Sequence, residues 1–436
     1  MQTVIGMILL ITFFAFIVYA FKGGNLLLGL FSMAVLWSLL GAIGGVVTWD
    51  SINKDVFQGG PEAFGPTAVN IIFGSWFGRV LIETGIARSI IRKAVELGGD
   101  KPSLTCVLLC IVTTAIFTTA YGAGAVVAIG VIVFPIMLSL GISKPLATSS
   151  FAMSVGCGLY VNSALLTQAA GTMVMEGAKY NPLSNEWYRF AGVALALHMA
   201  FVIAMVILGV NREKRSRAWA AGDTGVMGGG EKNANLLACI TPIIPVFLAI
   251  TFKFSPIVSI VLAVIWALFW TDYLKKWNSV GSVVEKTFHE GVTDVGLVLG
   301  FLLFLQMFIR AAGACKGLLA PIVAPVLPSG TMLLFIVFGV LGFLALFRGP
   351  LTIWGAGSAT FAIVAGTGLY PLSVLFPLFY IPCCTITASV CPTQSWNLWA
   401  IGYNKISVKD FLKQVLIFIL PLCLILEIIA YFMFAA

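Results

Sequence analysis

The chain has 436 residues, of which 60% are hydrophobic and only 10% are charged, and its formal net charge is +8. Soluble domains carry about 25% charged residues, so this composition excludes a protein that is surrounded by water on every side. The apolar runs reach the ~17–25 residues that span a bilayer and lack the alternation of a β-barrel strand, so we expect an all-α polytopic membrane protein.

The first half of the chain contains six apolar segments. They lie at about 2–20, 25–47, 67–87, 104–140, 145–175 and 189–210. The first has neither a basic n-region nor a small-residue cleavage site, so it is predicted to be a retained helix and not a signal peptide. The fourth is long enough for two half-helices, and a re-entrant hairpin is expected there with its tip at 118–124.

A hydrophilic linker at 211–235 divides the chain in the middle. It carries a basic cluster and a Gly-rich run, at residues 212–217 and 228–230. Six more apolar segments follow it, at about 236–252, 255–271, 291–312, 331–366, 371–402 and 411–434. The fourth of these is again long enough for a hairpin, with its tip at 348–350. We therefore divide the chain into an N-terminal repeat (1–210), a linker (211–235) and a C-terminal repeat (236–436).

The two halves resemble each other at matching places. Arg79 and Arg310 follow similar sequences in the third segment of each half, and Gly141 and Gly368 both stand shortly before a Pro-Leu pair. The positive-inside rule places the basic linker in the cytoplasm. Each half then has about five crossings plus one re-entrant hairpin, so the second half is upside down. Inverted repeats of this kind are typical of secondary transporters.

Polar and Gly-rich residues interrupt the apolar segments at four places, twice in each half. Such interruptions are tolerated at membrane depth where they line a cavity, and their free N–H and C=O groups bind anions and Na⁺. The predicted substrate-binding residues are Thr118, Thr119, Tyr121, Gly122, Gly124, Gly156, Gly158, Asn162, Ser163, Arg348, Gly349, Thr352, Gly355, Ser358, Thr387, Ser389, Thr393 and Gln394. A Na⁺ site is predicted near Thr119, Gly122, Asn162, Gly355, Thr387 and Ser389. The competing interpretation is that these small residues only pack helices together.

Arg348 is the most informative of these residues. A buried cation at membrane depth costs several kcal/mol unless it is paired, and no acidic residue lies between Asp294 and Asp410. Its partner is therefore distant in sequence, a set of carbonyl groups, or the carboxylate of a substrate, which the planar guanidinium suits. The alternative is a cation that reaches the aqueous interface.

Other polar residues in apolar segments are weaker candidates. Glu427 is a candidate proton site or a side chain that snorkels or pairs, and His198 is interpreted as a packed interface residue. His289, Glu290 and Asp294 are interpreted as a helix cap or a solvated end and not as a proton relay. The stretch 275–286 is predicted to form an amphipathic helix on the inner leaflet. Nine cysteines without a CxxC pair are assigned to packing, so no resident cofactor is expected.

The repeated order of hairpin and broken helix resembles the ion transporter superfamily, which includes gluconate permeases, citrate and C4-dicarboxylate carriers and arsenite pumps. The run 357–360 (Gly-Ser-Ala-Thr) looks like a motif of gluconate permeases, and Arg348 is similar to an arginine that precedes it. The sequence at 119–122 departs from those permeases, which carry an acidic residue there. The resemblance implies an elevator-type homodimer in a bacterial inner membrane, driven by Na⁺ or H⁺.

These observations favour a secondary active transporter of a small organic anion, a mono- or dicarboxylate or a sugar acid. A cation/proton antiporter of the same superfamily is the alternative, and it would usually need a buried carboxylate at a helix break. A membrane-embedded enzyme would need a cluster of catalytic groups, and a channel would not need two inverted halves. The expected partners are the anion, the lipid bilayer and a second copy of the chain, and not nucleic acid.

Overall fold

The computed structural model describes residues 2–22, 24–99, 101–173, 180–214, 235–275, 277–328 and 330–435. This part of the chain is built from helices, six of which are long and apolar enough to cross a membrane, or up to seven if a bent pair counts as one span. The prediction of an all-α, multi-span membrane protein is confirmed. Of the predicted linker, only residues 211–214, at the end of a helix, and residue 235 are described; residues 215–234 lie outside the described part.

The helices of the first half follow the order of the predicted segments. They are α1 (Gln2–Phe21), α2 (Leu26–Ile43), α3 (Trp49–Ser51), the π-helical η1 (Ile52–Gln58), α4 (Gly59–Glu83), α5 (Ile86–Gly98), α6 (Pro102–Phe117), α7 (Ala123–Ser139), α8 (Lys144–Gly158), α9 (Ser163–Thr172) and α10 (Asn185–Lys214). Gly85, with φ of 71°, ends α4 in a conformation that other residues rarely adopt. Ser143 caps α8, since its side chain accepts a hydrogen bond from the Leu146 N–H.

The helices of the second half begin after the predicted linker. They are η2 (Ala238–Ile243), α11 (Ile244–Thr251), α12 (Pro256–Trp270), η3 (Tyr273–Lys275), α13 (Trp277–Ala314), α14 (Lys316–Val323), η4 (Ala324–Val326), α15 (Thr331–Val340), η5 (Leu341–Arg348), α16 (Gly357–Gly366), α17 (Leu372–Pro382), the π-helical η6 (Cys383–Ala388), α18 (Ser395–Asn404) and α19 (Val408–Phe434). Gly368, with φ of 69°, precedes α17 as Gly141, with φ of 74°, precedes α8.

Two predicted boundaries are wrong. The segment predicted at 67–87 is α4, which begins at Gly59 and continues directly from α3 and η1. The separate interfacial helix predicted at 275–286 does not form, because α13 runs without a break from Trp277 to Ala314. The charged residues Glu290 and Asp294 are therefore inside a long helix and not at its start.

The helix interruptions lie where the sequence places them. The first hairpin turns between α6 and α7, and the second turns between η5 and α16. The helix predicted at 145–175 is broken between α8 and α9, which meet at an angle of 72°; its residues 174 and 175 lie outside the described part. The fourth interruption begins in the π-helical turn η6 and ends before α18.

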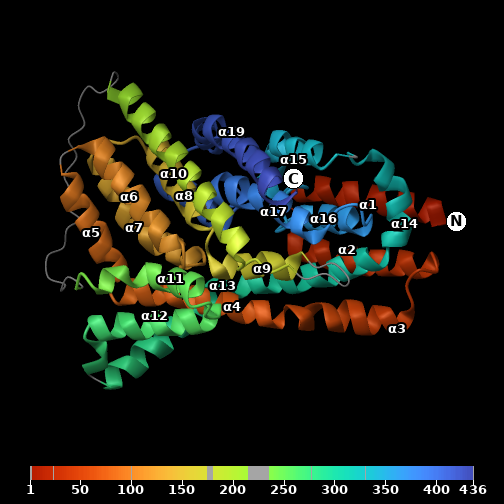
Figure 1. The fold of residues 1–436 in the computed structure, drawn as a ribbon, viewed down its shortest axis with the longest axis horizontal. Coiled ribbons are helices and arrows are strands. Elements are labelled where there is room, and N and C mark those ends of the chain that lie inside the picture. The colour runs from red at the N-terminus through yellow and green to blue at the C-terminus, as the bar shows by residue number, and fades with distance from the viewer. Residues whose placement is uncertain are drawn as a thin grey trace.

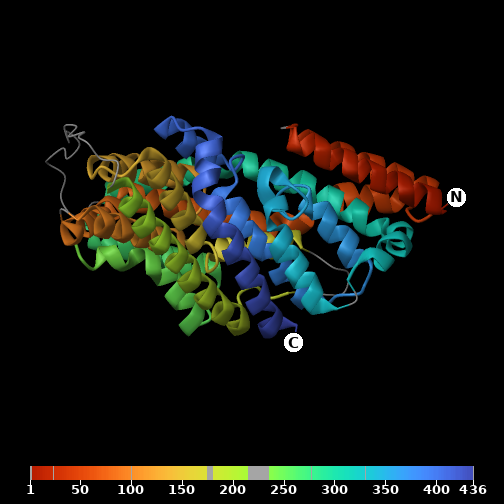
Figure 2. The ribbon, with the colours of Figure 1, turned by 90° about the horizontal axis from the view of Figure 1, so that it is seen from above.

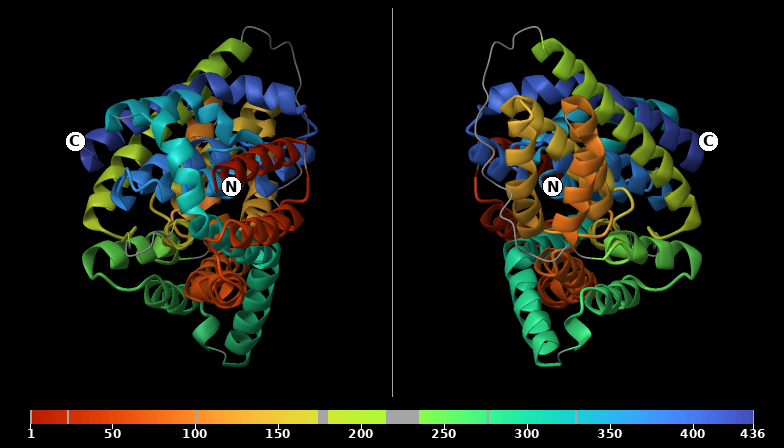
Figure 3. Two further views of the ribbon diagram at one scale, coloured as in Figure 1. Left: turned by 90° about the vertical axis from the view of Figure 1, so that its right-hand side faces the viewer. Right: turned by 90° about the vertical axis from the view of Figure 1, so that its left-hand side faces the viewer.

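A pair of long helices, α4 and α13, joins the two halves. α13 packs most extensively against α4 and α2. Figure 1 shows α1, α2 and α14 at one end of the molecule and α5, α11 and α12 at the other. Figure 2 shows α1 along one side of the molecule. Figure 3, viewed along the long axis, shows α4 nearly end-on with the first turns of α13 extending below it.

α4 and α13 form equivalent contacts at the two ends of the pair: the part that α4 plays at one end is played by α13 at the other. A Cβ added to Gly60 of α4 would lie 3.2 Å from the backbone of Gln306 in α13. A Cβ added to Gly291 of α13 would lie 3.3 Å from the backbone of Ser75 in α4. The shift of 231 residues that relates Arg79 to Arg310 also relates Gly60 to Gly291 and Ser75 to Gln306. The two helices therefore cross antiparallel about a local two-fold axis.

Candidate functional site

The first hairpin tip is held by the first helix break. The Asn162 side chain donates hydrogen bonds from Nδ2 to the carbonyl oxygens of Phe117 (3.0 Å) and Ala120 (2.9 Å). Its Oδ1 accepts from the Leu165 N–H at 3.1 Å and so caps α9. Asn162 is fully buried. Asn162, a predicted site residue, thus fixes the position of the predicted hairpin tip at 118–124.

The polar side chains of this tip face two different neighbours. The Thr119 hydroxyl donates to the carbonyl oxygen of Pro242 in η2 at 2.8 Å, and the Thr118 hydroxyl donates to the Ala115 carbonyl at 2.7 Å. The Tyr121 hydroxyl donates to Oε1 of Gln168 in α9 at 2.8 Å. The tip is therefore tied to the second half of the chain through Thr119 and to the broken helix through Tyr121.

The second hairpin tip is a tightly wound loop between η5 and α16. Phe347 (φ 53°) and Arg348 (φ 62°) both adopt the left-handed conformation, which is uncommon for residues other than glycine. The Arg348 carbonyl accepts from the Ala356 N–H at 2.9 Å, and its Nη1 donates to the Trp354 carbonyl at 3.1 Å. Among the described residues, Arg348 forms no ion pair with a carboxylate. Its observed partner is a carbonyl group, one of the alternatives considered above.

The second tip is held by the second helix break, partly through sulfur atoms. The Thr387 hydroxyl donates to the carbonyl of Ala345 in η5 at 3.1 Å. The Phe347 N–H donates to Sγ of Cys391 at 3.1 Å, and the Ile353 N–H donates to Sγ of Cys383 at 3.3 Å. Thr387, Cys383 and Cys391 thus hold the second tip as Asn162 holds the first tip, although the residue types differ.

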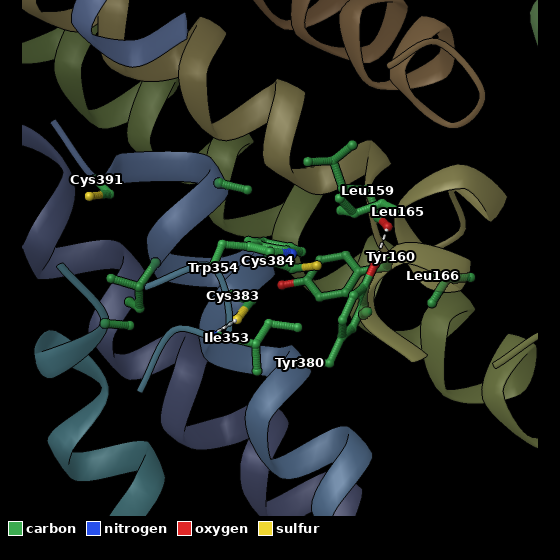
Figure 4. Close-up of a cluster of buried hydrophobic side chains, with 14 of the residues drawn as sticks. Leu159, Tyr160, Leu165, Leu166, Ile353, Trp354, Tyr380, Cys383, Cys384 and Cys391 are labelled. Atoms are coloured by element: carbon green, nitrogen blue, oxygen red, sulfur yellow. Dashed lines mark hydrogen bonds between the residues drawn. The ribbon is translucent and has the colours of Figure 1, made fainter. Parts of the chain in front are cut away.

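The two halves meet between these tips and breaks. A side chain at Gly156 in α8 would collide with Ser389, so α8 and the second break are in direct backbone contact. The Tyr380 hydroxyl donates to the Leu159 carbonyl at 2.9 Å. Figure 4 shows Tyr160 from the first break and Trp354 from the second tip pointing toward each other across the cysteines of η6. The four predicted interruptions therefore converge, and aromatic side chains fill the space between them.

The remaining predicted residues take smaller parts in this arrangement. The Ser358 hydroxyl donates to the Gly355 carbonyl at 2.8 Å, and the Ser389 hydroxyl donates to the Cys384 carbonyl at 2.7 Å. The Thr352 and Thr393 hydroxyls contact cysteine sulfur atoms at 3.7 and 3.1 Å. Gly122, Gly349 and Ser163 lie in or next to the turns. The six residues predicted for Na⁺ fall into one group at each tip, and the site itself stays a prediction.

Sequence reasoning missed several residues at the centre. Trp354 is buried, and its Nε1 has no partner within the described part of the chain. Gln168 receives the hydrogen bond from Tyr121, and Tyr160 lies 3.2 Å from Nδ1 of the fully buried His198. Cys383 accepts a backbone N–H from the second tip. Their place in the sequence could have identified them, because each of these residues lies within about one helical turn of a predicted helix interruption or packs across from one.

A second polar network lies beside the first tip. Arg79 of α4 forms two hydrogen bonds with the carboxylate of Asp294 in α13, both at 2.6 Å, and its Nη1 lies 3.3 Å from Glu290. The backbone of Gly124, at the start of α7, lies directly against this pair, so that a side chain there would collide with Asp294 and Arg79. The interpretation of Asp294 as a cap is therefore wrong: it joins the two long helices next to the hairpin.

Glu427 is fully buried in α19, and neither of its carboxylate oxygens has a partner within the described residues. It does not snorkel to an interface, and no ion pair compensates for its burial. An unpaired carboxylate at this depth costs several kcal/mol, whereas a protonated carboxyl group costs much less.

Comparison with solved structures identifies a protein of similar fold. The chain is similar to the YdaH transporter of Alcanivorax borkumensis, whose crystal structure was described as having an unusual topology. The two are 14% identical, with a TM-score of 0.59 over 93% of this chain and 97% of that chain. No family model matches the chain, and no curated protein matches its sequence. The chain therefore has the multi-span helical fold of a known membrane transporter, including a bent helix pair.

Proposed function

We propose that this protein is a secondary active transporter of a small organic anion, with a mono- or dicarboxylate or a sugar acid as its cargo. The similar fold of the YdaH transporter supports the general class. Two hairpin tips that converge on two broken helices support a central binding site, because such interruptions supply backbone donors and acceptors for a polar cargo. The aromatic filling between the tips would have to part when the cargo enters.

The observation that carries the choice of an anion is Arg348. Its guanidinium lies at the second tip, donates one hydrogen bond to a carbonyl and has no carboxylate partner among the described residues. The indole N–H of Trp354 at the same tip is a second donor that lacks a partner in the described structure. A substrate carboxylate placed here would satisfy both groups.

The proposed mechanism is an elevator. The two hairpins and the two broken helices would move as one unit against a scaffold that contains α4 and α13. The symmetric contacts of α4 and α13 support two inverted repeats, 1–210 and 236–436, because an antiparallel pair related by a two-fold axis is what inverted halves produce. We further propose a homodimer in a bacterial inner membrane, with the linker at 211–235 in the cytoplasm and Na⁺ or H⁺ as the coupling ion.

Thermal unfolding of the detergent-solubilised protein with succinate, citrate or gluconate, in Na⁺ and in K⁺ buffers, tests the role of Arg348. We expect at least one acid to raise the unfolding temperature of the wild type. Arg348→Ala should lose this effect, because removal of a charged hydrogen-bond donor costs about 2–3 kcal/mol of binding free energy, or about 30- to 160-fold in affinity. Arg348→Lys should keep part of it. Equal stabilisation of wild type and Arg348→Ala by the same acid would contradict the assignment.

A cation/proton antiporter is the second candidate, and the buried, unpaired carboxyl group of Glu427 is the observation that favours it. This residue is also compatible with proton coupling of an anion carrier. Glu427→Gln distinguishes a role of Glu427 in proton transfer from a structural role. The glutamine amide has the shape of the carboxyl group but cannot take up and release a proton. A cation-driven pH change inside vesicles that disappears in Glu427→Gln, without any uptake of organic acids by the wild type, would favour the antiporter.

A further inference from the structure

The two symmetry-related arginines of α4 and α13 differ in their partners. Arg79 pairs with Asp294 at one end of the helix pair. At the other end, the shift of 231 residues places Arg310 at the position of Arg79 and Ala63 at the position of Asp294. Ala63 and Arg310 line the same pocket. Since alanine has no carboxylate, Arg310 lacks the partner that its counterpart has, and no described residue forms an ion pair with it.

The pocket that contains Arg310 is large enough for a small metabolite. Its volume is about 450 Å³, and it lies between α4, α9 and α13, with Tyr180 and Leu372 also in its lining. Its walls carry polar groups from Thr67, Asn70 and Thr167, and none of the described residues that line it is acidic. The Oδ1 of Asn70 and the hydroxyl of Tyr180 are buried and have no partner in the described structure.

We propose that this pocket binds the carboxylate of a small organic anion, with Arg310 as its anion-binding residue and the Tyr180 hydroxyl as a second donor. The bound carboxylate would occupy the place that Asp294 takes beside Arg79. The pocket adjoins α9, whose Gln168 holds the first tip through Tyr121, so the anion would stand between the scaffold and the broken helix. That the anion is the transported cargo rests on the proposed function; the binding itself does not.

Charge-selective labelling of a cysteine in the pocket tests this proposal without any transport. Thr167→Cys places a thiol in the pocket wall, and an anionic (sulfonatoethyl) and a cationic (trimethylammonioethyl) methanethiosulfonate are compared. Of the native cysteines, only Cys239 is more than marginally exposed, so the protein without Thr167→Cys gives the background. We expect the ratio of anionic to cationic labelling rates to fall about tenfold when Arg310→Gln is added, because one unit charge a few Å away alters both rates in opposite directions.

Two further variants show whether the charge of Arg310, and not a change in the shape of the pocket, determines the labelling ratio. Arg310→Lys should keep the ratio of the wild type. Ala63→Asp should lower the ratio as much as Arg310→Gln does, because it supplies the partner that Asp294 provides to Arg79. Succinate should slow anionic labelling in the presence of Arg310 but not in Arg310→Gln, at matched ionic strength. An unchanged ratio in Arg310→Gln, a lack of labelling by both reagents, or no protection by succinate, citrate or gluconate would overturn the proposal.

Discussion

Asp294→Ala is expected to destabilise the protein by about 3 kcal/mol, because it removes the two hydrogen bonds of the largely enclosed Arg79 guanidinium and leaves it only the longer contact with Glu290. The side chains of Arg79 and Asp294 are only 23% and 11% exposed, and their two hydrogen bonds join α4 to α13. The unfolding temperature in lipid nanodiscs measures the effect. The double variant Arg79→Leu/Asp294→Leu should recover part of the loss, since it removes both charges together.

The matched control is Glu83→Ala, which breaks the ion pair of Glu83 with Lys286 between the same two helices. That pair is much more exposed, at 31% and 52%, so its loss should change the unfolding temperature little. An unfolding temperature for Asp294→Ala equal to that of the wild type would show that the pair does not join the helices. The same conclusion would follow if Arg79→Leu/Asp294→Leu lost more stability than the sum of the losses in Arg79→Leu and Asp294→Leu.

Gly158→Ala is expected to separate α8 from the first hairpin. A Cβ at this position would lie 2.6 Å from the Thr114 carbonyl oxygen, 2.8 Å from the Phe117 carbonyl carbon and 2.9 Å from the Thr118 nitrogen. All three are backbone atoms, which cannot move aside as the end of a flexible side chain can. Overpacking of this kind costs about 3 kcal/mol, and the unfolding temperature in nanodiscs should fall accordingly. Uptake should fall as well, because Asn162 would no longer reach the tip.

Gly192→Ala is the control for this prediction. Gly192 lies exposed in α10, and nothing stands within 4 Å of a Cβ added there. Alanine has the higher helix propensity, so this variant should be as stable as the wild type or slightly more stable. If Gly158→Ala unfolds at the temperature of Gly192→Ala, the close contact between α8 and the hairpin tip is wrong.

Much of the fold can be predicted from local sequence because local chemistry determines it. Apolar runs give the spans, and the glycines with positive φ, such as Gly141 and Gly368, mark where a helix must end. The helix interruptions are predictable for the same reason. The continuity of α13 was not predictable, because the charged residues Glu290 and Asp294 suggest a helix end until their partner Arg79 is known.

The site is harder to predict because its contacts are distant in sequence. Thr119 is predicted to bind substrate, and its sequence surroundings do not show that its hydroxyl donates to the carbonyl oxygen of Pro242. In the sequence, Arg79 is recognisable only by its similarity in position to Arg310, because its partner Asp294 lies 215 residues away. Cys383 looks like a small packing residue in any local window, and only the fold brings its sulfur to the N–H of Ile353. Long-range packing decides these roles, and no periodicity in the sequence reports it.

Locking the first tip to α4 tests the central proposal, that hairpins and broken helices carry an organic anion past a scaffold. A Cβ at Gly78 in α4 would lie 3.5 Å from the Cβ of Ala120 in the tip, and disulfides join Cβ atoms that are about 3.5–4.5 Å apart. The measurement is uptake of radiolabelled succinate, citrate and gluconate into proteoliposomes by Gly78→Cys/Ala120→Cys. We predict uptake of at least one acid by the reduced protein, a stop on oxidation, and recovery on reduction. Absence of uptake by reduced and wild-type protein alike, or equal rates before and after complete cross-linking, would contradict the proposal.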